Sequence, residues 1–209
     1  MATFLSVEIT DLMMALMGYL FGSVPFGLLL TSYFANINIR SVGSGNIGAT
    51  NVLRTGRKGL AVLTLITDGS KGAVAVLLAV YIADYQLPGL VGFAAVCGHC
   101  FPIWLKGRGG KGVATGMASL AALFWPAGLL CAASWLVLAA LFRVSSLAAL
   151  GSFIISIAAV WTVFSAQLMP STPFWMSLIA AVIIIRHHSN IQRLMNGTET
   201  KISFSRKDS

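Results

Sequence analysis

Apolar residues run in long blocks along this chain, and polar residues gather in the short segments between the blocks. Seven blocks have roughly the length of a membrane-spanning helix: about 10–35, 59–82, 88–105, 112–124, 126–142, 146–167 and 172–186. The fourth block is short for a bilayer, and Pro126 separates it from the fifth. The pattern predicts an all-α, polytopic integral membrane protein with seven transmembrane helices in a single membrane domain over residues 1–209.

Composition supports lipid as the solvent of most of the chain. Of the 209 residues, 57% are hydrophobic and only 10% are charged, whereas a soluble domain has about 25% charged residues. No segment between the blocks is long enough to form a separate soluble domain. The first thirteen residues contain Glu8 and Asp11 but no Lys or Arg. We therefore expect no cleaved signal peptide, which needs positive charge before its apolar core.

Basic residues fall on alternate polar segments, which predicts an orientation. If the N-terminus lies outside, the inner segments are 36–58, 106–111, 143–145 and 186–209, and they hold thirteen of the fourteen Lys and Arg residues; Lys71 is the exception. The outer segments hold Glu8, Asp11 and Asp84 and no basic residue. The positive-inside rule then places the C-terminus in the cytoplasm and requires an odd number of spans. The net charge of +8 reflects either attraction to anionic lipid headgroups or an anionic substrate on that face.

The first inner loop is crowded with glycines and hydrogen-bond donors. Within six positions it contains Gly43, Ser44, Gly45, Asn46 and Gly48. Glycines let backbone N–H groups converge on one point, and Ser and Asn add side-chain donors, so the loop suits a phosphate. Arg54 adds a bidentate clamp. The Gly-x-Gly-x-x-Gly match to a dinucleotide site is weak because a membrane span, not a strand, precedes it; a flexible linker is the alternative.

The second inner loop, 106–115, is a glycine-rich basic turn that leads directly into an apolar helix. Gly110 and Lys111 lie next to the start of that helix, where free N–H groups and the helix dipole favour an anion. The turn is not a Walker A loop, because its glycine spacing differs and no Ser or Thr follows the Lys. A positive-inside loop with helix breakers is the alternative.

The last inner segment carries histidines. His187 and Asn190 are three residues apart and share one face if the helix continues. His187 suits a general base, an anion donor, or simply a cation at a helix C-terminus. Cys97 and Cys100 form a Cys-x-x-Cys spacing, but no second Cys or His pair completes a metal site. We therefore expect no metal and no cofactor.

Two charged residues, Asp68 and Lys71, lie near the middle of the second block. Each costs about 2.5–3.5 kcal/mol if unpaired at the bilayer centre. The explanations are a proton or ion path, or a neutralised structural pair in a polar region of the bundle. A transporter of anionic solutes would use such charges, but all glycine-rich basic loops fall on one face and no inverted repeat is evident. An assembly protein leaves the loop chemistry unexplained.

Taken together and in order, these motifs resemble the bacterial acyl-phosphate:glycerol-3-phosphate acyltransferases (PlsY). The matching segments span residues 22 to about 200: Gly22-Ser-x-Pro-Phe-Gly27, Gly43-Ser-Gly-Asn-Ile-Gly-Ala-Thr-Asn51-Val-x-Arg54, Asp68-x-x-Lys-Gly72, Gly98-His-x-Phe-Pro102, Gly109-Gly-Lys-Gly-Val-Ala-Thr115, and Arg186-His-x-x-Asn-Ile-x-Arg-Leu194 followed by Gly197-Thr-Glu199. The chain departs from the family at Gly107-Arg108, where Phe-Lys is common, and at His188, where Arg is common. After the fifth block the family often has more serines than the two found here, Ser145 and Ser146.

The resemblance implies an enzyme that transfers a fatty acyl group from acyl phosphate to the 1-hydroxyl of glycerol 3-phosphate. The products are lysophosphatidic acid and phosphate, in the first step of phospholipid synthesis. It implies a multi-pass protein of the bacterial inner membrane with its active site on the cytoplasmic face. The expected partners are the two substrates and membrane lipid, with no nucleic acid.

Site residues follow from the motifs and the resemblance together. The expected catalytic residues are His187, Asn190, Lys111 and Ser146, the last preferred over Ser145. The expected phosphate-binding residues are Ser44, Gly45, Asn46, Asn51, Arg54 and Gly110. The base is either His187 or the donor phosphate, and we favour the phosphate with His187 as a positioning group. Glu199, after a Gly-Thr turn, is interpreted as structural. The His-x4-Asp motif of soluble acyltransferases is absent.

Overall fold

The computed structural model describes residues 9–83 and 87–202, and within these ranges all regular structure is helical. In chain order the elements are α1 (Ile9–Gly22), α2 (Phe26–Ala35), η1 (Ile39–Ser41), α3 (Ala49–Leu53), α4 (Lys58–Ala83), α5 (Pro88–Cys100), η2 (Ile103–Leu105), α6 (Val113–Leu123), α7 (Trp125–Phe142), α8 (Ser145–Thr162), η3 (Ser165–Gln167), α9 (Ser171–Arg186) and α10 (His188–Met195). Four charges used to predict the orientation lie outside the described residues: Glu8, Asp84, Arg206 and Lys207. The all-α prediction is confirmed for the described part of the chain.

Each predicted apolar block is largely helical, but the blocks differ in their capacity to cross a bilayer. Five segments are long and apolar enough to do so: Ile9–Ala35, Lys58–Tyr81, Pro88–Leu105, Trp125–Phe142 and Ser145–Thr162. The pair α9 and α10 adds a sixth if counted as one span, although the two helices meet at a 58° bend. With 11 residues, α6 is only about 16 Å long, about half the hydrocarbon thickness. The seven-span count therefore stays a prediction.

The first block is two helices rather than one continuous helix. It breaks after Gly22, and α2 begins at Phe26 directly after Pro25, whose ring removes a backbone donor and clashes with the preceding turn. At this break the carbonyl oxygen of Val24 accepts a hydrogen bond from Lys71 Nζ on α4, at 2.9 Å. The break in one helix thus provides a polar partner for a charge buried in another.

Charges within α4 are neutralised inside the bundle. Lys71 is fully buried and Asp68 nearly so, and Lys71 Nζ lies 2.8 Å from Asp68 Oδ1. Lys71 Nζ also lies 2.9 Å from Nδ1 of His99 on α5; since an ammonium can only donate, Nδ1 accepts. Of the two explanations for these charges, this geometry corresponds to the neutralised structural pair, because each charge has a partner in the apolar interior.

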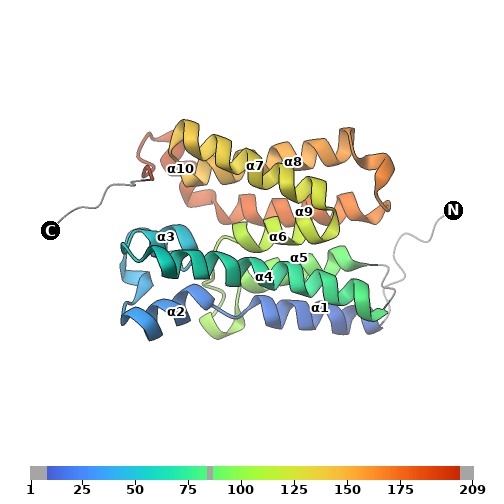
Figure 1. Cartoon of the computed structure of the whole chain (residues 1–209), viewed down its shortest axis with the longest axis horizontal. Helices are drawn as coiled ribbons and strands as arrows, with labels where there is room; N and C mark the ends of the chain where they lie inside the picture. The colour runs from blue at the N-terminus through green and yellow to red at the C-terminus, as the bar shows by residue number, and fades with distance from the viewer. Residues whose placement is uncertain (1–8, 84–86, 203–209) are drawn as a thin grey trace.

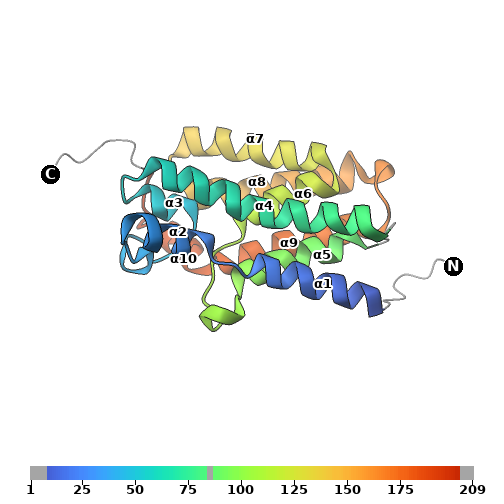
Figure 2. The same cartoon turned by 60° about the horizontal axis from the view of Figure 1, so that its bottom comes forward.

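The helices lie roughly along the long axis of the molecule (Figure 1). Packing pairs α1 with α5, α4 with α5 and α6, and α7 with α8, while α9 contacts α5 and α8. Small residues allow the closest approaches: a Cβ on Gly98 of α5 would collide with the Tyr19 carbonyl oxygen of α1, as expected for membrane helices that associate through small residues. Both views place α2, α3 and α10 together at one end of the bundle (Figures 1 and 2). The polar loops of the candidate site lie at this end.

Candidate functional site

The Gly109–Gly110 turn of the second inner loop is held in place by hydrogen bonds to three other residues. Its Gly109 N–H donates to the Cys100 carbonyl at 3.2 Å, and its Gly110 N–H donates to the His99 carbonyl at 3.0 Å. From the end of α9, the Arg186 guanidinium donates to the carbonyl oxygens of Gly109 and Gly110, both at 3.2 Å. A Cβ on Gly110 would collide with Nε2 of the His99 ring. Only glycine fits at position 110, and the backbone leading into Lys111 is therefore fixed.

Lys111 lies directly before the N-terminal end of α6. Its neighbour Gly112 is the N-cap of that helix, with a φ of +78° that favours glycine. Burial lowers the pKa of Lys111 to about 8. Nearby charges also act on it: Glu199 raises the pKa, and three arginines lower it, Arg193, Arg54 and Arg186. Lys111 is thus a half-buried cation among other cations, a setting that favours a bound anion.

Glu199 joins two other elements at the same end of the bundle. Its Oε1 accepts hydrogen bonds from Ser146 Oγ on α8 (2.9 Å) and from Asn190 Nδ2 on α10 (2.7 Å). Its Oε2 accepts from Arg193 Nε at 2.6 Å, and the side chain is only 8% exposed. Burial raises the pKa of Glu199, but the hydrogen bonds from Asn190, Arg193 and Ser146 outweigh it and hold the pKa below its ordinary value. An ionised carboxylate therefore orients two of the predicted catalytic side chains, a positioning role that the sequence interpretation, which took Glu199 as structural, did not specify.

His187 lies at the bend between α9 and α10, and Asn190 lies in the first turn of α10. The His187 ring is buried, with Nδ1 2.7 Å from the Ile183 carbonyl oxygen; because a carbonyl only accepts, Nδ1 carries the proton and Nε2 is left as an acceptor. Burial lowers the pKa of His187 to about 4, so the ring is neutral near pH 7, unlike the helix-end cation considered above. The buried Oδ1 of Asn190 has no hydrogen-bond partner among the described residues.

Asn51 organises the first inner loop from inside. Its Nδ2 donates to the carbonyl oxygens of Ile39, Val42 and Asn46 at 2.8–3.1 Å, and its Oδ1 accepts from the Ser44 N–H at 3.1 Å. All polar atoms of this side chain are thus used by the loop itself. We therefore assign Asn51 to ordering the loop rather than to touching a phosphate.

The cradle predicted from backbone N–H groups takes a different form in the structure. The N–H groups of Ser44, Gly45 and Gly110 donate to Asn51 Oδ1, the Val42 carbonyl and the His99 carbonyl, respectively. These glycines shape the turns, since Gly45 has a φ of +69°. Groups that remain to meet an anion include the side chains of Ser44 and Asn46 and the first N–H groups of α6. Asn46 Oδ1 is buried and has no hydrogen-bond partner in the described ranges.

The first loop meets the C-terminal segment through Arg54, whose Nη2 donates to Thr200 Oγ1 at 2.6 Å. Ser145 Oγ lies 3.3 Å from Thr50 Oγ1 of α3, whereas Ser146 contacts Glu199. The two adjacent serines therefore have different partners. Ser146 and Asn190 both donate to the carboxylate of Glu199. Segments far apart in sequence thus gather the cations and polar groups in one place.

Comparison with known proteins shows which family the chain belongs to. Residues 12–197 match the family model described as glycerol-3-phosphate acyltransferase. This chain belongs to the glycerol-3-phosphate acyltransferase family. Family members from Jannaschia sp. (strain CCS1) and Paramagnetospirillum magneticum are each 50% identical to it, over 90% and 91% of this chain and 91% and 92% of theirs. The predicted family and enzyme class are confirmed.

Solved structures agree with this assignment. The crystal structure of PlsY, an integral membrane glycerol 3-phosphate acyltransferase, in its glycerol 3-phosphate form has 34% sequence identity and a TM-score of 0.85, over 93% of this chain and 96% of that one. The lysophosphatidic acid form has 33% identity and a TM-score of 0.83. The present acyltransferase is thus an integral membrane protein with bacterial relatives. Among its described residues no group of three or more His, Cys, Asp or Glu is arranged to hold a metal ion.

Proposed function

We propose that this acyltransferase moves a fatty acyl group from acyl phosphate to the 1-hydroxyl of glycerol 3-phosphate, and that lysophosphatidic acid and phosphate are its products. The observation that carries the proposal is the gathering of Lys111, Arg54 and Arg193 around the Ser146–Glu199–Asn190 contacts. Two substrates that each carry a phosphate repel one another, and a cluster of cations offsets that repulsion. The glycerol 3-phosphate and lysophosphatidic acid forms of the related PlsY support the same substrate and product.

The proposed reaction is a direct attack on a mixed anhydride. The 1-hydroxyl oxygen bonds to the acyl carbon, the bond from that carbon to the phosphate oxygen breaks, and phosphate leaves as an anion. Holding both substrates in the correct geometry supplies about 7–11 kcal/mol of the barrier reduction. We assign Lys111 and Arg54 to phosphate binding, and the unpartnered Oδ1 of Asn190 to accepting a hydrogen bond from a glycerol hydroxyl.

The proton of the attacking hydroxyl has two candidate acceptors, His187 and the donor phosphate. Neutral His187 has Nε2 free to accept a hydrogen bond, but a pKa of about 4 makes it a weak base near pH 7. A phosphate with a second pKa of about 6 accepts a proton more readily at that pH. We therefore assign the proton to the donor phosphate and give His187 the task of aiming the hydroxyl.

We further propose the topology that places this chemistry in the cytoplasm of a bacterium. In this topology a single transmembrane domain covers residues 1–209, with seven spans in the inner membrane, the N-terminus outside and the C-terminus inside. Thirteen of the fourteen basic residues on one face support it, as does the gathering of α2, α3 and α10 at one end of the bundle (Figure 2). Reporter fusions after Lys58 and Lys111 should read inside, and fusions after Asp84 and Gln167 outside. A cytoplasmic reading after Gln167 would contradict the seven-span topology.

The function is tested with purified full-length protein given a long-chain acyl phosphate and glycerol 3-phosphate. We expect equal amounts of phosphate and lysophosphatidic acid. Acyl-CoA should not replace the donor, because the phosphate is part of what the site binds. Lys111→Ala should abolish most of the rate, whereas Lys58→Ala, which removes an exposed cation at the start of α4, should not. Equal rates with both donors would exclude the proposed donor, and glycerol 3-phosphate uptake by proteoliposomes without product would favour a transporter.

A further inference from the structure

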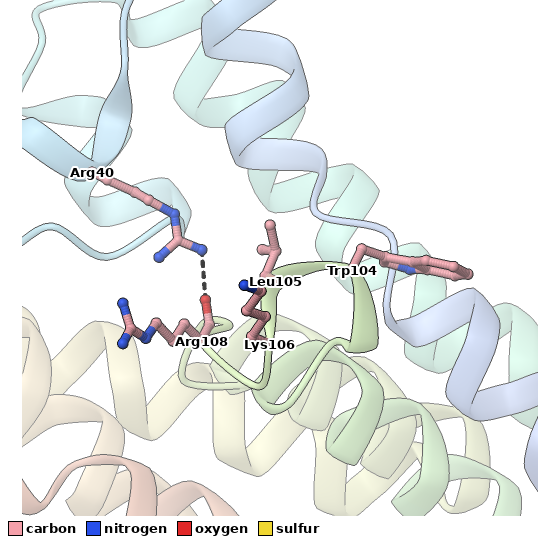
Figure 3. Close-up of a pocket in the computed structure, with 5 residues that line it drawn as sticks. All are labelled: Arg40, Trp104, Leu105, Lys106 and Arg108. Atoms are coloured by element: carbon pink, nitrogen blue, oxygen red, sulfur yellow. Dashed lines mark hydrogen bonds between the residues drawn. The ribbon is translucent and has the colours of Figure 1, made fainter.

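A second cluster of positive charge lies on the side of the bundle, apart from the reaction site. Arg40 of the first inner loop and Lys106 and Arg108 of the second line a pocket of about 420 Å³ together with Trp104 and Leu105 (Figure 3). Of the residues assigned to the reaction site, Lys111, Arg54 and Glu199 do not line this pocket. The proposed reaction leaves these three cations without a task.

The pocket is built by a specific contact between the two loops. Arg40 Nη2 donates to the Arg108 carbonyl oxygen at 2.6 Å, across 68 positions of sequence (Figure 3). The backbone of Arg40 is itself capped by the side chain of Asn38 at 3.1 Å. Lys106 ends η2 in a left-handed conformation with a φ of +51°, which is uncommon for a residue other than glycine. The cations are therefore brought together by the fold and not by chance along one loop.

No carboxylate balances this charge in residues 9–83 and 87–202. Asp68 and Glu199 form ion pairs in these ranges, and neither pairs with Arg40, Lys106 or Arg108. Three like charges around one pocket repel each other, so binding an anion there is favourable. The pocket thus has an electrostatic preference for a negatively charged group.

The position of the pocket indicates which kind of anion it binds. Trp104 and Leu105 are the last residues of the candidate span Pro88–Leu105, and Lys106 is the first residue beyond it. Ile103 and Trp104 are 60% and 61% exposed, and tryptophan is enriched at the level of lipid headgroups. Figure 2 shows the loop with η2 projecting from the side of the bundle. In the proposed topology, basic and apolar groups therefore lie side by side at the boundary between membrane and cytoplasm.

We propose that the pocket lined by Arg40, Lys106 and Arg108 binds the phosphate headgroup of an anionic membrane phospholipid. Trp104 packs against the glycerol backbone and the first methylenes of the acyl chains. The bound lipid strengthens the Arg40–Arg108 contact, and Arg108 directly precedes the Gly109–Gly110 turn that fixes Lys111. The lipid is resident, and it is distinct from the substrate and the product of the reaction.

The test counts lipids retained on the purified full-length protein by native mass spectrometry, with phosphatidylglycerol and phosphatidylcholine compared at equal concentration. Each basic residue near a membrane surface contributes about five-fold to binding an anionic lipid. Lys106→Gln/Arg108→Gln should therefore lower phosphatidylglycerol affinity about 25-fold. The matched control is Arg57→Gln/Lys58→Gln, two exposed cations that do not line the pocket; it should retain the lipid. Arg108→Lys should retain most of the binding.

Each other outcome overturns the proposal in a defined way. Equal losses in the two double variants would mean that general surface charge holds the lipid. Equal retention of phosphatidylcholine would show that headgroup charge is not read. Displacement of the lipid by inorganic phosphate at comparable concentration would make the pocket a free-phosphate site, and displacement by lysophosphatidic acid would make it a product site. The readout is lipid binding, so it does not depend on the proposed reaction; thermal unfolding of each variant confirms that it is folded.

Discussion

The sharpest prediction concerns the charge of Lys111, whose pKa burial lowers to about 8. If this ammonium binds phosphate, the active form of the free enzyme is the protonated one, which predominates below pH 8 and is lost as the pH rises. About nine-tenths of the lysine is charged at pH 7 and about one-tenth at pH 9. The value of kcat/KM should therefore fall about ten-fold between these pH values. Phosphate itself does not produce this limb, because its second ionisation, near pH 6, is complete.

The diagnostic variant is Lys111→Arg. A guanidinium stays charged throughout this range, so the alkaline limb should disappear. The rate at pH 7 should still be lower than that of the wild-type enzyme, because the planar fork does not reproduce the compact ammonium. Lys111→Ala should be weak at all pH values and show no limb. Saturating glycerol 3-phosphate should move the limb of the wild-type enzyme to higher pH, because a bound dianion favours the protonated lysine.

The assay is initial-rate phosphate release from acyl phosphate between pH 6 and pH 10, with the non-enzymatic release subtracted at each pH. Thermal unfolding at each pH separates loss of fold from loss of charge. If Lys111→Arg keeps the same alkaline limb as the wild-type enzyme, another group titrates and the assignment of Lys111 is wrong.

Three further predictions test the supports of the site. Glu199→Gln removes the charge that accepts three hydrogen bonds and should lower kcat/KM about 10- to 100-fold, since a bond to a charged group contributes about 1.5–3 kcal/mol. Because the pKa of Glu199 is held low, its carboxylate stabilises the fold at neutral pH, and this stabilisation is lost as the pH falls through the folded-state pKa. The stability of Glu199→Gln should therefore be lower at neutral pH and vary less with pH in acid. Gly110→Ala places a methyl group against the His99 ring and should reduce activity strongly, whereas Gly59→Ala, on an open face of α4, should not; equal rates for the two variants would contradict the steric argument. His187→Asn should lower kcat and raise KM together, and a folded variant without detectable turnover at saturating glycerol 3-phosphate would favour His187 as the base.

Helix positions were predictable because the apolar blocks and their Pro and Gly interruptions act locally along the chain. The end of α9 and the separation of α6 from α7 near Pro126 follow directly from such signals. The break at Pro25 lies inside one apolar block, where the hydrophobic pattern alone does not change. Pro25 explains why a helix breaks there, but the sequence does not show that the freed Val24 carbonyl serves Lys71 of α4. A contact across 47 residues leaves no trace in the periodicity of either segment.

Lys111 and His187 were chosen from the sequence because their residue types limit the chemistry that they can perform, and their roles stay predictions. Glu199 was underestimated because its role comes from partners distant in sequence: Ser146 lies 53 positions away. One signal was present. The inner segments carry thirteen basic residues and only two acidic ones, Glu199 and Asp208, and an acid in such surroundings is expected to pair with several donors at once. Attention to the few acidic residues in these basic segments would have identified Glu199 as a residue with several partners.

The Gly109–Gly110 turn connects the charges buried inside the bundle to the candidate site. Interpreted from sequence, the glycines of this turn offered N–H groups to a phosphate; in the structure, the Gly110 N–H binds the His99 carbonyl and its missing side chain makes room for the His99 ring. That ring accepts a hydrogen bond from Lys71, which in turn pairs with Asp68. Burying this pair costs free energy, and removing one member would leave the other charge uncompensated beneath the turn that carries Lys111. The ion pair inside the bundle thus supports the position of the cation that we assign to phosphate binding.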